Sequence, residues 1–139
     1  MKITFNDIFT AITALVALAA FVTSIRNARA IDRQKYYSDL DSLYVRVLEL
    51  GLAHPNLIDP ASTTHYQEKF TGDDLNRYNA YAFIVWNVCE TIYDYCKGDE
   101  ALWETWRPVI DAENTLHRTW LKNNQPKFKQ SFLEYMEVL

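Results

Sequence analysis

The most apolar stretch of the chain runs from Ile8 to Ile25 and contains eighteen residues without a charged side chain. A helix of this length rises about 27 Å, close to the roughly 30 Å of a bilayer's hydrocarbon core. Its polar side chains are hydroxyls, which bond back to the helix backbone and are tolerated in lipid. The pattern therefore predicts a single transmembrane helix near the N-terminus.

Two alternatives to a membrane anchor remain open for this stretch. A buried core helix normally carries a polar stripe, and here the polar positions are hydroxyls alone. A cleavable signal peptide is the stronger alternative, because Ala28-Arg29-Ala30 has the small-x-small form of a cleavage site. Against cleavage, the apolar run is long for a signal peptide, and Asp7 stands where such a peptide is expected to be positive.

Basic residues crowd the C-terminal flank of the predicted anchor. Because Lys and Arg are retained on the cytoplasmic side, the rest of the chain is expected to face the cytoplasm from the inner (cytoplasmic) membrane. Basic side chains at this position also attract anionic lipid headgroups, although they equally serve to end the apolar span. The residues expected at the headgroups are Arg26, Arg29, Arg33 and Lys35.

One narrow face of the anchor carries small side chains at alternating spacings of three and four. In lipid, small residues allow a second helix to approach closely, and this packing drives association. We therefore expect a partner helix, from a second copy or from another subunit of a larger membrane complex; the alternative is that an Ala-rich span is merely permissive. The expected interface consists of Thr10, Thr13, Ala17, Ala20 and Ser24.

The next apolar pattern also has helical spacing and follows directly on the anchor. The helix is expected to continue from Arg26 until Gly51 and Pro55 stop it. Its apolar stripe consists of Tyr36, Leu40, Leu43, Val47 and Leu50. Residues 51–72 contain several Gly and Pro and are expected to be irregular, apart from a short helix capped by Asp59.

Three further helices complete the prediction, at residues 73–97, 106–122 and 126–138. The first is apolar on most sides between Ala80 and Cys89, so other helices must pack around it, and Gly98 is expected to stop it. The second tolerates Pro108 in its first turn. Its apolar line consists of Val109, Ala112, Leu116 and Trp120.

Together these patterns predict an all-α fold. An N-terminal transmembrane helix with its basic flank occupies residues 1–30. It continues into a cytoplasmic antiparallel bundle of about four helices at residues 31–139.

Charge is unevenly distributed along the chain. The net charge is −4, but residues 1–35 carry +3 and residues 36–139 carry −7. An acidic domain is a poor match for nucleic acid, so no nucleic-acid partner is expected. Cys89 and Cys96 lie about 10 Å apart along one helix, too far for a disulfide, and two reduced thiols suit the cytoplasm.

No catalytic motif is recognisable, and no cofactor or metal is expected. Glu113 and His117 are one helical turn apart, and Glu90 and Asp94 have a similar spacing. Without a catalytic motif, the chain is expected not to be an enzyme. The alternative is an enzyme with a metal-dependent site formed by these four residues, around Glu113 and His117. The simpler explanation is that a partly buried Glu is satisfied by a neighbouring side chain.

A local basic patch lies in the C-terminal part of this acidic domain. Every charge between Glu113 and Glu134 is positive. Such a patch suits an anionic ligand or an acidic partner, and the alternative is an ordinary solvated face. Its residues are Arg118, Lys122, Lys127 and Lys129.

Three segments resemble an uncharacterised group of small bacterial proteins. They run from Tyr81 to Asp94, from Thr105 to Ile110 and from His117 to Trp120. The resemblance implies a single-pass anchor and a cytoplasmic helical domain, and it implies no site because the group has no assigned activity.

Two functions follow from these expectations. The first is a non-catalytic, membrane-anchored accessory or scaffold subunit that acts through protein–protein association. The alternative is an oligomeric membrane effector or sensor, for example in antiviral defence. Its cytoplasmic bundle would bind an anionic ligand or partner and signal to the anchor along the continuous helix.

Overall fold

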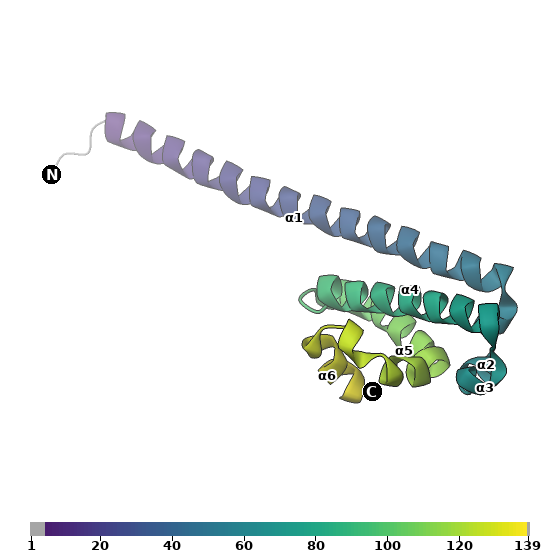
Figure 1. Cartoon of the computed structure of the whole chain (residues 1–139). Coiled ribbons are helices and arrows are strands. Elements are labelled where there is room, and N and C mark those ends of the chain that lie inside the picture. The colour runs from purple at the N-terminus through teal and green to yellow at the C-terminus, as the bar shows by residue number, and fades with distance from the viewer. Residues whose placement is uncertain (1–4, 139) are drawn as a thin grey trace. The chain divides into compact units, whose positions relative to one another are not determined.

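A computed structural model describes residues 5–138, with side chains from Thr13 onward. Every regular element in this range is a helix, so the predicted all-α class is confirmed (Figure 1). The elements are α1 (Phe5–Ala53), η1 (Pro55–Leu57), α2 (Pro60–Thr63), α3 (Tyr66–Lys69), α4 (Gly72–Cys96), α5 (Glu100–Asn123), η2 (Gln125–Lys127) and α6 (Gln130–Val138).

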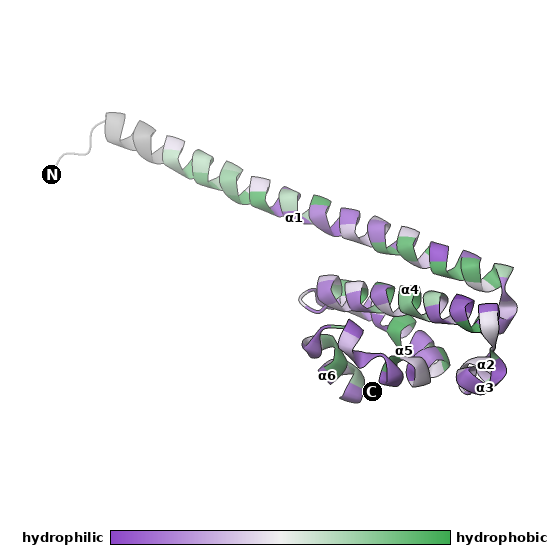
Figure 2. Cartoon of the chain, in the orientation of Figure 1, coloured by the Kyte–Doolittle hydropathy of each residue, from purple (hydrophilic) through white to green (hydrophobic). Residues whose placement is uncertain are grey.

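The chain divides into two units, Met1–Tyr37 and Ser38–Leu139, and helix α1 contributes to both. In the first unit, no side chain from Thr13 onward is buried, including the apolar ones that Figure 2 colours green. Within the described residues, α1 is the one helix long and apolar enough to cross a membrane, judged by length and composition. The buried-core alternative receives no support from this exposure.

The second unit has one hydrophobic core. Most side chains of this core come from four helices: residues 38–53 of α1, and α4, α5 and α6. The short helices α2 and α3 pack against α5 and α4 and close one side of the core. Its largest fully buried side chains are Trp86, Trp120, Tyr78 and Phe132. Because only residues 97–99 separate α4 from α5, the two helices turn back on each other and pack along their length.

Helix α5 begins earlier than its sequence predicts. It starts at Glu100 rather than residue 106, and the Asp99 side chain accepts a hydrogen bond from the Leu102 N–H at its N-terminus. Pro108 therefore lies inside the helix, not in its first turn. Both Pro108 and Glu104 are exposed, so the Glu104 carbonyl that Pro108 leaves without an N–H partner is open to water.

Of the predicted apolar line of α5, Trp120 is buried and Val109 packs against the core from a partly buried position. Val109 and Leu116 are half-buried and Ala112 is exposed. The buried face lies to one side of that line, because two polar side chains excluded by the hydrophobic pattern occupy its centre. Its members are Leu102, Trp106, Ile110, Glu113, His117, Trp120 and Leu121.

The faces of α1 and α4 also differ in part from expectation. On α1, Leu40 and Val47 are buried, but Leu43 is 44% exposed. On α4, Phe83 and Ile84 are each 41% exposed, so this helix is not surrounded on most sides. Both helices keep one outer face that no other element covers.

Gly98 follows the end of α4 as predicted, since α4 ends at Cys96 and Lys97 is its C-terminal cap. Gly72 is the glycine with positive φ among the described residues, so Gly98 does not adopt a left-handed conformation. Gly51, in contrast, does not stop its helix. Gly51 is buried within α1, which continues to Ala53. An added Cβ at Gly51 would lie 2.8 Å from Ile58 Cγ2 and 3.0 Å from Tyr81 Oη.

Helix α6 is attached to α4 through Lys129, the residue before its first turn. The Lys129 backbone N–H donates to Glu90 Oε1 at 2.7 Å, and its ammonium group pairs with Asp94. This ion pair holds the pKa of Asp94 below its ordinary value. The predicted helix at residues 126–138 is interrupted here, because residues 125–127 form the separate turn η2.

We expect Gly51→Ala to destabilise the fold. In an open helix, Ala is more stable than Gly by up to about 1 kcal/mol, but here the new methyl group overlaps Ile58 and Tyr81. The free energy of unfolding in urea should therefore decrease. Gly98→Ala is the control, since a Cβ there meets nothing within 4 Å. If Gly51→Ala is as stable as Gly98→Ala, the close contact is wrong.

Candidate functional site: a buried Glu–His pair

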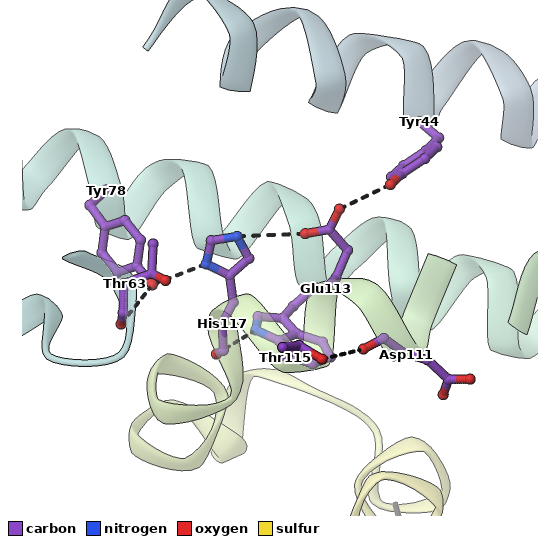
Figure 3. A network of polar contacts seen from close by, with 8 residues as sticks. Tyr44, Thr63, Tyr78, Asp111, Glu113, Thr115 and His117 are labelled. Atoms are coloured by element: carbon purple, nitrogen blue, oxygen red, sulfur yellow. Dashed lines mark hydrogen bonds and ion pairs between the residues drawn. The ribbon is translucent and has the colours of Figure 1, made fainter. Parts of the chain in front are cut away.

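The candidate site centres on Glu113 and His117, which lie one turn apart on α5. Their exposed fractions are 4% and 0%. Glu113 Oε2 and His117 Nε2 are 3.5 Å apart, within ion-pair distance, and among the described residues neither atom has a hydrogen-bond partner (Figure 3). The prediction of a partly buried Glu satisfied by its neighbours is therefore half right, because one oxygen faces only the imidazole.

The second oxygen of Glu113 connects α5 to α1. The hydroxyl of Tyr44 donates to Glu113 Oε1 at 3.2 Å, across 69 residues of sequence (Figure 3). Tyr44 also contacts Trp106 edge-on, with ring centroids 6.5 Å apart. Residues 38–53 of α1 are therefore held on the core by the buried side chains of Leu40 and Val47 and, in addition, by the partly buried Tyr44–Glu113 hydrogen bond.

The opposite side of the imidazole connects α5 to α4 and α2. His117 Nδ1 lies 3.0 Å from the Tyr78 hydroxyl, which is also 3.5 Å from the Thr63 carbonyl oxygen (Figure 3). The indole N–H of Trp86 donates to the backbone carbonyl of His117 at 3.2 Å. The Tyr81 ring packs edge-on against the imidazole, so the ring is held from several sides.

Burial determines the charge of these groups. Removal from water raises the pKa of Glu113, an effect that its hydrogen bond from Tyr44 partly offsets. The same desolvation lowers the pKa of His117 to about 4. Burial also raises the pKa values of Tyr44, Tyr78 and Tyr81, so their hydroxyls remain protonated donors.

The structure does not assemble the four residues of the metal alternative. Glu90 and Asp94 bind Lys129, whereas Glu113 and His117 bind tyrosines of other helices. Within the part of the chain that the structure describes, no group of three or more His, Cys, Asp or Glu side chains is placed to hold a metal ion.

The two cysteines are free and buried in the described structure. Desolvation raises the pKa of both thiols, that of Cys96 to about 11. A protonated thiol is a poor nucleophile. The prediction of two unpaired core thiols is confirmed.

The predicted basic patch is dispersed over several surroundings. Arg118 and Lys122 line one surface hollow beside Leu133 and Met136. The Lys127 ammonium lies over the Trp120 ring, 5.0 Å from its centroid, and Lys129 is paired with Asp94. Only the first two of the four residues therefore line one hollow, which the acidic Glu137 lines as well.

The residues predicted on the anchor all belong to α1. Arg26, Arg29, Arg33 and Lys35 are exposed, as are Thr13, Ala17, Ala20 and Ser24. Ala20 and Ser24 line a shallow hollow on this helix together with Thr23, Asn27, Ala28 and Ile31. The side chain of Thr10 lies outside the described residues. The Thr23 hydroxyl donates to the Ala19 carbonyl of the same helix at 2.8 Å.

No protein-family model, curated protein or solved structure matches this chain. The resemblance to small bacterial membrane proteins therefore stays a prediction.

Sequence analysis missed three members of the network: Tyr44, Tyr78 and Thr63. Tyr44 lies one turn from both Leu40 and Val47, so its polar tip within a buried stripe is a signal that could have identified it. Tyr78 and Thr63 reach the site from separate helices, and local periodicity contains no information on that meeting.

We expect His117 to destabilise the protein as the pH falls. Its folded pKa of about 4 lies below the ordinary 6.5, so the unfolded chain binds a proton more readily between these values. Stability is therefore present above pH 6.5 and decreases toward pH 4, by about 3 kcal/mol for this group. Glu113 acts in the opposite direction, because its raised pKa favours the folded state at low pH.

The measurement is urea unfolding at pH 4.5 to 7.5 for the wild type and His117→Gln. The variant should lose less stability on acidification than the wild type. His65→Gln, at an exposed position, is the control and should retain the wild-type slope. Equal slopes in all three proteins would contradict the assignment of a buried neutral imidazole.

Proposed function

We propose that the chain is a non-catalytic, single-pass membrane protein whose helical domain works by association at the cytoplasmic face of the inner membrane. The observation that supports this proposal is the exposure of the apolar part of α1. Leu15, Leu18 and Phe21 are 66%, 59% and 63% exposed. Burying each such side chain is worth about 1.5–3 kcal/mol, so a lipid environment stabilises this segment strongly.

The basic flank supports the orientation of the proposed anchor. Arg26, Arg29 and Arg33 follow the apolar segment and are exposed on the same helix. Placed at the cytoplasmic surface, they satisfy the positive-inside rule and face anionic headgroups.

Exposed apolar side chains on the second unit support association with a partner. Val45, Leu48 and Leu52 follow one another at helical spacing on α1 and are 44%, 45% and 74% exposed. Phe83 and Ile84 add a second apolar area on α4. Apolar surface of this kind is typical of subunit contacts, which suits either a homo-oligomer or a subunit of a larger membrane complex.

The Tyr44–Glu113 contact favours a second candidate, an oligomeric membrane effector or sensor. It attaches a buried ionisable pair to α1, the helix that also carries the anchor. A ligand or partner that changes the packing around Glu113 would therefore act on α1 directly. Arg118 and Lys122 would contact an anionic ligand of such a sensor.

Membrane insertion is tested by Leu18→Arg. An arginine near the middle of the span costs about 2.5–3.5 kcal/mol of insertion free energy. We expect the wild type to remain in the membrane fraction after alkaline carbonate extraction and the variant to be partly released. Leu52→Arg, also at an exposed leucine of α1, is the control and should remain in the membrane. A wild-type protein found wholly in the soluble fraction contradicts the proposal.

Association is tested by native mass spectrometry after gentle detergent extraction. A scaffold subunit should appear in a fixed ratio with other proteins, whereas an effector should appear as a homo-oligomer. Ala20→Leu should weaken either assembly roughly tenfold or more, because a bulky side chain prevents close approach of helices. Ala19→Leu makes the same change on the neighbouring face and should have little effect. A monomer under all conditions would rule out both candidates.

A further inference from the structure

One hydroxyl in the buried network has two acceptors within reach. The Tyr78 oxygen lies 3.0 Å from His117 Nδ1 and 3.5 Å from the Thr63 carbonyl oxygen (Figure 3). A hydroxyl carries a single proton, so Tyr78 donates to one of these atoms at a time. The choice depends on whether Nδ1 carries a proton of its own.

The other side of the imidazole imposes a matching constraint. His117 Nε2 and Glu113 Oε2 face each other at 3.5 Å, and neither atom has a hydrogen-bond partner within the part of the chain that the structure describes. Two lone pairs facing each other in a buried site would repel, so a proton must lie on one of the two atoms. The imidazole therefore couples the carboxyl group to Tyr78 through its two nitrogens.

Two proton arrangements satisfy these constraints. In the first, Glu113 is a carboxylate that accepts from the Tyr44 hydroxyl, His117 carries its proton on Nε2, facing Oε2 at 3.5 Å, and Nδ1 accepts from Tyr78. In the second, Glu113 carries a proton on Oε2, facing an unprotonated Nε2. Nδ1–H then donates to the Tyr78 oxygen, and Tyr78 donates to the Thr63 carbonyl. The second arrangement contains one proton more than the first.

We propose that the Glu113–His117 pair is a one-proton switch that transfers hydrogen bonding from the Tyr44 end of the network to the Thr63 end. A proton that arrives at the Tyr78 oxygen displaces the original Tyr78 proton to Nδ1, and the Nε2 proton passes to Glu113 Oε2. The total is one proton bound and no covalent bond broken other than O–H and N–H. The inference depends only on contacts within residues 38–138 and not on membrane insertion.

The titratable groups around the Glu113–His117 pair are already protonated, so the additional proton binds to the pair. The titratable side chains that act on it are Tyr44 from α1 and Tyr81 and Cys89 from α4, with Tyr66 of α3 next to Tyr78. Burial raises the pKa of Tyr44, Tyr81 and Cys89, so these three groups are already protonated. Burial raises the pKa of Glu113 as well, which favours the carboxylic acid over an imidazolium as the protonated form.

The two arrangements hold different parts of the fold. A hydrogen bond to a carboxylate is roughly twice as strong as one to a neutral acceptor, so protonation weakens the attachment of Tyr44 and thereby of α1. The new bond from Tyr78 strengthens the attachment of α2 through Thr63. We expect amide exchange in residues 38–53, corrected for its intrinsic pH dependence, to become about three- to tenfold faster in the protonated form.

The direct test is nitrogen NMR of the histidine side chains in the full-length chain in detergent micelles. On lowering the pH toward about 4, where His117 itself would become charged, His117 should change from the Nε2–H to the Nδ1–H tautomer while remaining neutral, because the pKa of Glu113 is raised above its ordinary value. Tyr78→Phe removes the Nδ1 partner but leaves the Glu113–His117 contact, so the tautomer change should become incomplete. A single tautomer over the whole pH range, or conversion to an imidazolium, would overturn the switch.

Hydrogen–deuterium exchange tests the effect on α1. Glu113→Gln is permanently neutral and should show fast exchange in residues 38–53 at every pH. Tyr44→Phe keeps both ionisable groups and should also lose the pH dependence, which serves as an independent variant if Glu113→Gln does not fold. If exchange in Tyr44→Phe depends on pH as strongly as exchange in the wild type, the proposal is overturned, because the effect then does not pass through this hydroxyl.

Discussion

Two indole N–H groups hold α4 and α5 together inside the core, and the other contacts of the domain depend on this pairing. Trp86 donates to the His117 carbonyl and Trp120 donates to Asn79 Oδ1. Both indoles are fully buried, so each contributes a large apolar area together with one specific hydrogen bond. The register of α5 on α4 is thereby set, and it determines which residues of α5 can meet α1 and α2.

This register places the carboxyl group of Glu113 and the imidazole of His117 in the core, where most side chains are apolar. Burying two ionisable groups is unfavourable unless both are hydrogen-bonded, and apolar replacements of similar volume are often at least as stable. Tyrosines from α1 and α4 compensate one polar atom of each group, and the remaining atoms, Glu113 Oε2 and His117 Nε2, face each other. A cost in stability at the junction of α1, α2, α4 and α5 is consistent with a role in coupling these elements, as the sensor candidate requires.

Several local features of the fold follow from the sequence, and the predictions for α5 fail for identifiable reasons. The Asp59 side chain caps the short helix α2 as expected. The predicted start of α5 is wrong because it assigns Pro108 to the first turn, whereas this exposed proline lies inside the helix. The predicted apolar line of α5 differs from its buried face because that line contained apolar residues alone, whereas Glu113 and His117, which are of types that ordinarily remain exposed or intermediate, are buried in the structure.

The sequence by itself determined the helical elements, the apolar N-terminal segment and the unpaired core thiols, because each depends on residues close together in the chain. Only the tertiary structure decided the hydrogen-bonded network. Tyr44 meets Glu113 across 69 residues, and Tyr78 meets His117 across 39. Such meetings depend on how whole helices pack, and the spacing of residues within one helix contains no information on which distant side chain will lie opposite.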